Sequence, residues 1–289
     1  MKTIQKTAIA LAASGLFATA AFAQTAPAAA PEAPEASPLT ANVTVVSDYR
    51  YRGISQSNFK PAIQGGFDYA HESGFYIGNW NSSISWISDA APATANTRVT
   101  APIEMDFYGG IKKEFIGEGF ASDFGVLQYY YPSSGIAVQG TQANPNTTEL
   151  YVAQNFTFGA VTGFAKFSYA VSPLFGFANS TGSYYPDLTA NYDTGIWGIT
   201  LNGHVGYQKV AGQPGTQNGV STAGAGTNLS YTDWKLGATK DFGGGLSLSA
   251  SYVSTNANPY WWSTWTGTNG AANGSAGRGG AVVALTKVF

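Results

Sequence analysis

The chain of 289 residues contains no cysteine, which excludes a disulfide framework and any cysteine-based metal or nucleophile site. Only 10% of its residues are charged, against about 25% in ordinary soluble domains. Aromatic residues make up 14% and there are 36 glycines. The formal net charge of −2 gives a nucleic-acid partner no electrostatic support.

Residues 1–23 have the composition of a secretory signal peptide: two lysines at the start, an apolar stretch, and the cleavage signal Ala21-Phe22-Ala23. We expect cleavage before Gln24 rather than a single membrane anchor, because the apolar stretch is short for a span and ends in small residues. Cleavage removes two lysines and no acids, so the mature charge is 12 − 16 = −4.

Residues 24–38, QTAPAAAPEAPEASP, form a Pro/Ala-rich linker. Its proline content favours an extended, semi-rigid tether over a folded domain. We expect a plain periplasmic spacer, with an anchor to the cell wall or to a partner as the alternative.

From Leu39 to Phe289 the sequence has a period of two, which indicates β-strands. Strand character is found in twelve segments: 40–54, 62–72, 75–86, 103–115, 120–131, 148–158, 160–170, 184–193, 196–209, 229–242, 245–256 and 278–289. A chain that is poor in charge yet has no long apolar run is typical of a membrane barrel, whose lipid-facing and lumen-facing residues alternate. We therefore predict that residues 39–289 form an all-β, transmembrane, antiparallel up-and-down β-barrel of about 12 strands.

The connections between these segments alternate in length. Short turns follow the second, fourth, sixth, eighth and tenth segments, whereas the connections between them are long and the first, 55–61, is intermediate. Outer-membrane barrels have short periplasmic turns and longer external loops. We therefore expect both chain ends on the periplasmic side of the cell outer membrane.

The alternation also divides the side chains between two faces. A soluble barrel alternates too, but it would need many more charges on its outer face. The predicted pore-lining residues are Asp48, Arg50, Arg52, Asp68, Glu104, Asp106, Lys112, Asp123, Glu149, Lys166, Asp187, His204, Asp233, Lys235 and Arg278. The predicted lipid-interface aromatics are Tyr49, Tyr51, Phe67, Tyr69, Trp80, Trp197, Tyr207 and Trp234.

The inward charges bear on selectivity. With Glu72 added to the acids above, the inward-facing positions carry nine acids and six bases. Acidic rings favour cations, so the excess predicts a weak cation preference for a pore that small solutes or ions cross by passive diffusion. Twelve strands lie between the filled interior of about eight and the open channel of about sixteen to eighteen, which leaves the width of the lumen undecided.

The chain ends on the segment AVVALTKVF, in which apolar residues alternate up to the terminal Phe289. A terminal aromatic in this phase resembles the assembly signal of bacterial outer-membrane barrels. We expect the barrel-assembly machinery to recognise this strand; the alternative is a strand that simply ends in Phe.

Several stretches resemble one family. SDYRYRGISQS at 47–57, AIQGGFDYAHESGFYIGNW at 62–80 and YTDWKLGATKDFGG at 231–244 are similar to the TorF family of predicted porins in Gram-negative outer membranes. Shorter matches are EMDFYGG, YYYP and HVGY. The resemblance covers about the whole mature chain and implies an outer-membrane barrel, whereas the family's porin activity is itself inferred from fold. It carries over no catalytic or binding residue.

Enzyme motifs such as G-x-S-x-G and H-E-x-x-H are absent from the sequence. A Ser/His/acid site would have to use His71 or His204, so a barrel esterase or lipase is the weakest of the alternatives. Glu104 and Asp106 share a strand face, but a pair of lumen acids balanced by bases explains them better than a metal site. We expect no metal, no cofactor and no enzyme activity.

One further alternative is a closed structural or adhesive barrel that acts through its external loops. The stretch NPYWWSTWTGTNG, residues 258–270, contains three tryptophans in a predicted external loop. Such a loop offers a recognition surface for sugar or lipid, or it extends the outer aromatic girdle.

Overall fold

The protein is described by a computed structural model covering residues 37–90, 100–133, 144–177, 179–211, 228–259, 262–265 and 272–289. The predicted signal peptide and its cleavage site, and the linker up to residue 36, lie outside the described residues. The twelve strands of the barrel are β1 (Leu39–Val46), β4 (Ala62–Ala70), β5 (Phe75–Ser83), β6 (Ile103–Gly117), β7 (Phe120–Tyr130), β8 (Thr147–Phe158), β9 (Val161–Ala170), β10 (Tyr184–Asp193), β11 (Ile199–Gln208), β12 (Tyr231–Asp241), β13 (Leu246–Thr255) and β16 (Gly280–Val288). Four short strands and one helix complete the described elements: β2 (Arg50–Tyr51), β3 (Ile54–Ser55), β14 (Ser263–Trp265), β15 (Ala272–Ser275) and α1 (Trp86–Ala90).

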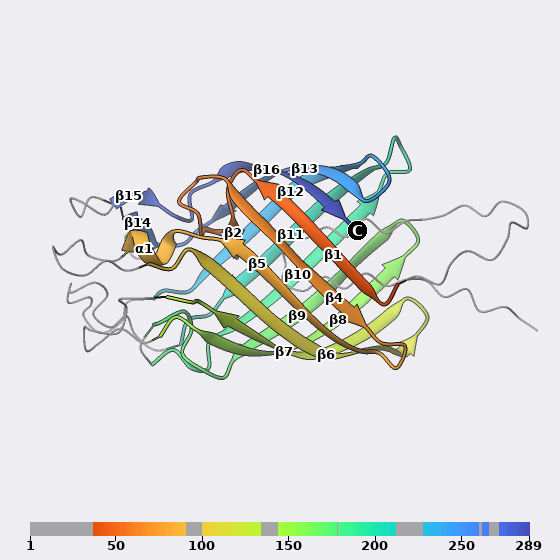
Figure 1. Cartoon of the computed structure of the whole chain (residues 1–289), viewed down its shortest axis with the longest axis horizontal. Coiled ribbons are helices and arrows are strands. Elements are labelled where there is room, and N and C mark those ends of the chain that lie inside the picture. Colours follow the sequence, from red (N-terminus) through yellow and green to blue (C-terminus); the bar gives the residue numbers. More distant parts are fainter. Residues whose placement is uncertain are drawn as a thin grey trace, which may run out of the picture.

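Each long strand pairs antiparallel with the strands before and after it, and β1 pairs with β16 to close the barrel. The closing register sets Val43 opposite Lys287 and Val45 opposite Leu285. Figure 1 shows the strands crossing the barrel at a common tilt. Closure leaves no unpaired sheet edge, which a barrel in lipid requires. The predicted antiparallel barrel of about twelve strands is confirmed.

Eleven of the twelve predicted segments match a barrel strand to within a few residues at each end. The first is wrong in length: the segment predicted at 40–54 ends as β1 at Val46. Residues 47–61 leave the barrel wall and fold through the small β2–β3 hairpin before β4 begins at Ala62. We call residues 47–61 the inward segment.

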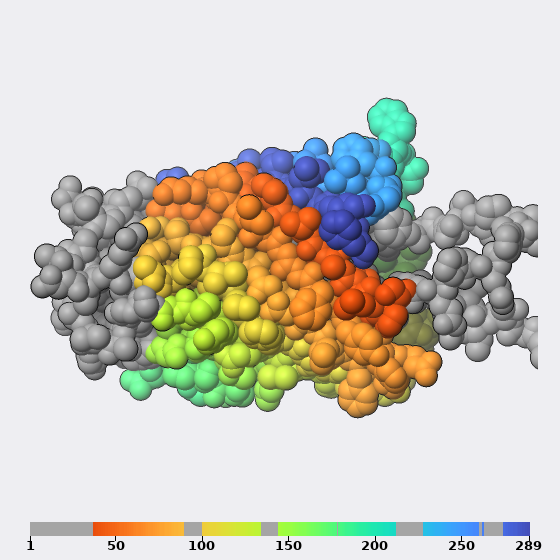
Figure 2. Space-filling model, in the orientation of Figure 1, coloured from red at the N-terminus to blue at the C-terminus, as the bar shows by residue number. Residues whose placement is uncertain are grey.

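The two ends of the barrel differ. β1 starts at the same end as the C-terminus, where the short turns lie, on the right in Figure 1. α1, β14 and β15 lie at the opposite end, which we call the long-loop end. At the short-turn end, the turn between β10 and β11 projects past its neighbours (Figure 2), and it carries Trp197, whose side chain is 81% exposed.

Burial alternates along the strands as the period of two predicts. In β6, Glu104, Asp106 and Tyr108 are buried in the barrel interior, whereas Phe107 is exposed on the outside. The large exposed side chains on the barrel strands are mainly Val, Ile, Leu and aromatic residues, on a continuous outer wall. Among the described residues, no helix is long and apolar enough to cross a membrane.

Candidate functional site

The inward segment crosses the interior of the barrel at the long-loop end. Tyr49 donates a hydrogen bond to Glu104 on β6 at 2.5 Å, and the hydroxyls of Tyr51 and Tyr129 on β7 are 2.6 Å apart. Tyr49 is only 1% exposed. The prediction that Tyr49 and Tyr51 face lipid is therefore wrong, because the chain that carries them has turned into the lumen.

Arg52 reaches furthest across the lumen. Its Nη2 donates to Glu149 Oε2 on β8 at 2.7 Å and its Nη1 to Gln208 Oε1 on β11 at 2.6 Å. The guanidinium also stacks on the ring of Tyr185 on β10, 4.2 Å from its centroid. One side chain thus joins three wall strands, so Arg52 lies inside the barrel as predicted, but on the inward segment rather than on a wall strand.

The inward segment is held in shape by Asp48. Its carboxylate accepts hydrogen bonds from Arg50 Nε and, at 2.6 Å, from Ser55 Oγ. Arg50 also donates to the backbone carbonyl of Gly53 at 3.0 Å. Asp48 and Arg50 therefore pair within the inward segment, and Arg50 also donates to the carbonyls of Ala276 at 3.3 Å and Arg278 at 3.0 Å, just before β16.

The turn of this hairpin fits closely against the barrel wall. Arg52 and Gly53 have φ angles of 45° and 77°, which reverse the chain. A Cβ on Gly53 would lie 2.3 Å from Thr255 Cγ2 and 2.7 Å from Asp233 Cβ. Only glycine combines this conformation with this close an approach.

Trp80 is a second lipid-interface prediction that the structure overturns. It is 3% exposed and packs edge-on against Tyr49, with 5.4 Å between ring centroids. It shares the phase of Tyr76 and Ser82, whose side chains are buried. The other predicted interface aromatics point outward, with side chains 37–81% exposed: Phe67, Tyr69, Trp197, Tyr207 and Trp234.

Charged residues on the wall follow one hydrogen-bonded row of neighbouring strands. Lys112 on β6 lies opposite Asp123, and Lys166 on β9 lies opposite Asp187. The small Ala153 separates Asp123 from Lys166 in this row, and Gly206 separates Asp187 from Asp233. Opposite charges on directly facing strand positions stabilise the pairing. The row places both signs of charge on the lumen wall.

Tyrosine rings cover glycines on the same wall. A Cβ on Gly78 would lie 2.3 Å from the Tyr108 ring, and one on Gly206 would lie 2.0 Å from the Tyr185 hydroxyl. The rings therefore lie along the wall in the space that a side chain would fill, as in aromatic rescue of strand glycines. Tyr108 in turn donates to Asp68 at 2.5 Å.

The acids at the long-loop end are the most buried charges. Glu104 accepts hydrogen bonds from Tyr49 and, at 2.7 Å, from Tyr131, and it is 1% exposed. Asp106 is equally buried, and neither of its carboxylate oxygens has a hydrogen-bond partner. Among the described residues, no group of three or more His, Asp or Glu side chains is arranged to hold a metal ion.

His204 lies inside the barrel, in the phase predicted for it. Its Nε2 is 3.0 Å from the Tyr185 hydroxyl and 3.1 Å from Asp233 Oδ2, and its Nδ1 is 2.9 Å from Thr189 Oγ1. Both ring nitrogens are thus engaged, and none of these partners is a serine. His71, in contrast, is exposed in the turn between β4 and β5.

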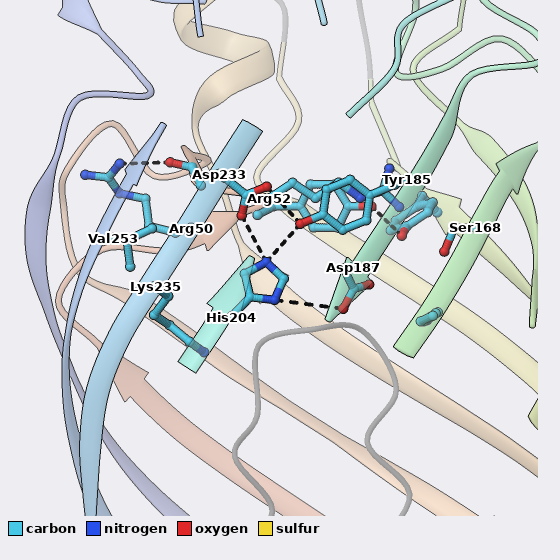
Figure 3. A pocket seen from close by; sticks show the side chains of 13 residues that line it. Arg50, Arg52, Ser168, Tyr185, Asp187, His204, Asp233, Lys235 and Val253 are labelled. Carbon is cyan, nitrogen blue, oxygen red and sulfur yellow. Dashed lines mark hydrogen bonds and ion pairs between the residues drawn. The ribbon is translucent and has the colours of Figure 1, made fainter. Parts of the chain in front are cut away.

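A cavity opens between the inward segment and strands β9 to β13 (Figure 3). It contains about 570 Å³ of empty space, open solvent included. In Figure 3, Arg52 lies between Asp233 and Tyr185. His204 lies below these side chains, and dashed lines join its imidazole to Asp233, Tyr185 and Asp187. The lining residues are Arg50, Tyr51, Arg52, Gly53, Tyr129, Lys166, Ser168, Tyr185, Asp187, His204, Asp233, Lys235 and Val253.

Two further predicted residues lie at the ends of the barrel. Arg278 precedes β16 and is exposed, with its guanidinium 3.8 Å from the centroid of the Phe59 ring. It therefore lies against the inward segment at the rim rather than in the row of wall charges. Phe289 follows β16 at the short-turn end, and its side chain is 71% exposed.

The tryptophan-rich stretch 258–270 is described only in part. Trp262 packs edge-on against Phe177 and Tyr231, and its indole Nε1 donates to the carbonyl of Leu229 at 3.1 Å. This tryptophan therefore packs against neighbouring residues at the long-loop end. Trp261 lies outside the described residues, and so does the side chain of Trp265.

The inward segment is the feature that the sequence analysis missed. Its signals are Gly53 directly after the alternating Tyr and Arg residues, and Ser55 and Ser57 spaced to bond Asp48. Alternation alone does not separate a strand from a two-residue hairpin, because both keep the period of two.

Several solved structures are similar to this chain at low sequence identity. The KdgM porin aligns at 6% identity with a TM-score of 0.48, over 86% of this chain and 98% of that one. The NanC porin aligns at 7% identity with a TM-score of 0.49, over 86% of this chain and 98% of that one. LpxR from Salmonella typhimurium aligns at 11% identity with a TM-score of 0.43, over 86% of this chain and 99% of that one. A search of the curated proteins finds no match.

A family model matches residues 28–289, and its description is "Bacterial protein of unknown function (Gcw_chp)". The TorF name that the motifs suggested stays a prediction. Because the match spans most of the sequence, the chain belongs to the Gcw_chp family of bacterial proteins of unknown function.

Proposed function

We propose that the protein is an outer-membrane, porin-like channel in which small solutes or ions diffuse through a charged lumen narrowed by the inward segment. The observation that carries this proposal is the division of the barrel into an apolar exterior and an interior lined by acidic and basic side chains. Phe107, Val205 and Leu236 are exposed on the outside, whereas Lys166 and Asp187 face the cavity. An apolar band around a polar interior is the arrangement of membrane channels.

The inward segment sets the width of the proposed path. It binds the wall through Glu104, Tyr129 and Glu149, on three successive strands. The cavity beside it is bounded by the strands on the other side of the barrel, β9 to β13. The proposed path therefore runs along that side, past Lys166, Asp187 and His204.

The proposed selectivity is a weak preference for cations. Eight acids and five bases are on the inward segment or the inward wall: Asp48, Asp68, Glu104, Asp106, Asp123, Glu149, Asp187 and Asp233, against Arg50, Arg52, Lys112, Lys166 and Lys235. Most of the acids are bonded to tyrosine hydroxyls or to arginine, which weakens their effect on ions. Acidic linings favour cations, so the remaining excess supports the preference.

The proposed orientation has the short turns in the periplasm and the long-loop end outside the cell. Phe289 supports a contact between the last strand and the barrel-assembly machinery, because its exposed ring is free to be recognised. We assign transport and not ester hydrolysis to the interior, since none of the hydrogen-bond partners of His204 is a serine.

The test is the single-channel current of the refolded mature chain in a planar bilayer under a salt gradient. We expect discrete steps and a reversal potential on the cation side. The variant Asp187→Asn should move that potential toward zero, because it removes a carboxylate that lines the proposed path and whose Oδ1 has no hydrogen-bond partner among the described residues. The control Glu118→Gln changes an exposed turn residue and should leave the potential unchanged.

A folded barrel that carries no current would refute the channel and favour the closed barrel that acts through its loops. That alternative has one observation in its favour, the set of contacts that the inward segment makes with β6, β7, β8 and β11. An unchanged reversal potential in Asp187→Asn would refute the assigned cation preference and leave the channel standing.

A further inference from the structure

In the part of the chain that the structure describes, the cavity beside the inward segment is lined by charged side chains whose hydrogen bonding is incomplete. Arg52 is bound to Glu149 and Gln208, and Asp233 accepts hydrogen bonds from Tyr185 and pairs with His204. Arg52 and Asp233 therefore each have hydrogen-bond partners of their own. Among the described residues that line the cavity, two lysines and one carboxylate oxygen lack such partners.

Lys166 and Lys235 are those lysines. Both line the cavity, and among the described residues neither ammonium forms a hydrogen bond or lies within 4.0 Å of a carboxylate oxygen. Lys166 instead lies over the Tyr151 ring, 4.1 Å from its centroid. Lys112 differs, because it donates to Asn155 Oδ1 at 3.2 Å and does not line the cavity.

Asp187 lies on the wall between the two lysines. Its side chain is more than nine-tenths buried, and among the described residues its Oδ1 has no hydrogen-bond partner; the imidazole nitrogen His204 Nδ1 lies 3.8 Å away. Asp187 faces Lys166 across one strand pair, and His204 faces Lys235 across another. The carboxylate therefore lacks a donor at the place where two ammonium groups lack an acceptor.

The four residues come from four successive strands, β9 to β12. Neighbouring strands are about 4.8 Å apart and Lys235 lies two residues out of the Lys166 row, so the two backbones are separated by roughly 16 Å along the wall. Long side chains on the concave face of a barrel point toward its axis, which shortens the gap between their ends. Figure 3 shows Lys235 beside His204, with Asp187 on the other side of the histidine.

We propose that this cavity is a solute-binding subsite in which Lys166 and Lys235 bind the carboxylate of a small organic acid while Asp187 accepts a hydrogen bond from a hydroxyl or ammonium group of the same molecule. The inference rests on the proposed channel only for the route by which the solute arrives. Charge-assisted bonds to a carboxylate are among the stronger polar contacts, and partial burial strengthens them. The subsite thus binds an anion inside a lumen that carries more acidic than basic side chains.

The test uses two probes that differ by one hydroxyl, lactate and propionate. Binding to the refolded full chain in detergent micelles is measured by saturation-transfer difference NMR over a concentration series. We expect lactate to bind several-fold more tightly than propionate, because only lactate offers Asp187 a donor. Each lysine should contribute about tenfold to the affinity.

The variants distinguish binding by Lys166 and Lys235 from a general effect of positive charge in the lumen. Lys166→Gln/Lys235→Gln should lose lactate binding, whereas Lys166→Arg/Lys235→Arg should keep it and Lys112→Gln should bind like the unchanged protein. The gel shift between unheated and heated samples checks that each variant is folded. If the double glutamine variant does not fold, each single glutamine variant is compared with Lys112→Gln in its place.

The outcomes for the subsite and for the channel are distinguishable. Lactate binding equal in Lys166→Gln/Lys235→Gln and the unchanged protein, or no binding to either, overturns the subsite. Equal affinity for lactate and propionate overturns the part assigned to Asp187. A folded barrel that binds lactate through its lysines and carries no current refutes the channel and retains the subsite.

Discussion

Replacing Arg52 by alanine tests whether an ion pair across the lumen holds the inward segment in place. The guanidinium bonds Glu149 at 2.7 Å and Gln208 at 2.6 Å, and the side chains of Arg52 and Glu149 are 6% and 1% exposed. Removing one partner of a buried ion pair leaves the other charge uncompensated, which costs about 3–5 kcal/mol. We expect Arg52→Ala to lower the free energy of unfolding by about that amount.

A second substitution separates the ion pair from the packing of the arginine. In Arg52→Ala/Glu149→Gln the uncompensated carboxylate is gone, so the double variant should be more stable than the sum of the two single effects by at least about 1.5 kcal/mol. Arg278→Ala is the matched control, because that arginine is exposed and also stacks on a ring. It should change stability by less than about 0.5 kcal/mol.

The assay is urea-induced unfolding of the refolded chain in lipid vesicles, followed by tryptophan fluorescence. Additive effects of the two single substitutions would refute the claim that Arg52 and Glu149 act as a pair. The same proteins are then compared in planar bilayers. We expect the conductance of Arg52→Ala to rise, because the inward segment loses the side chain that reaches β8 and β11.

Three further expectations follow from the barrel. Leu236→Arg, on the exposed middle of β12, should lower the free energy of unfolding in vesicles by about 2–4 kcal/mol, whereas Ile196→Arg in the β10–β11 turn should lower it by about 0–1 kcal/mol. Urea titrations measure both values, and equal costs would contradict lipid contact at β12. Gly206→Ala should lower the free energy of unfolding by about 1–3 kcal/mol, because the Tyr185 ring occupies the space of the added Cβ. Gly203→Ala should be tolerated, because the nearest atom to its added Cβ is 3.8 Å away. The difference between the urea midpoints of the two variants tests this expectation. Phe289→Ala should lower the amount of barrel in the outer membrane without changing its stability in vitro, and normal amounts in the membrane would remove the proposed assembly signal.

Most of the barrel wall was predictable from local pattern. The period of two and the alternation of short and long connections located eleven strands, and they placed Glu104, Asp187 and Lys166 in the interior. β5 was predicted as a strand, but the placement of Trp80 was wrong. The polar residues Asn79 and Asn81 flank it, so neither face of that strand is clearly apolar, and only the register with β4 and β6 shows which side faces in.

The arrangement of the candidate site depended on contacts between distant parts of the chain. Lys166 and Lys235 were both expected inside, but nothing in their local sequence shows that they lack partners. That property depends on where Asp187 and His204 lie on the intervening strands. A row of neighbours around a barrel joins residues that are far apart in sequence, so local periodicity does not reveal which charges are paired.

The residue pattern alone is enough to specify a closed, alternating barrel, because every second residue of each strand faces the same side of the wall. It did not determine what fills that barrel. Asp48 to Arg52 keep the same alternation whether they extend β1 or fold back as a hairpin. The tertiary structure decided between the two, since Gly53 fits against Asp233 and Thr255, and Arg52 finds Glu149 and Gln208, only when the barrel has closed around them.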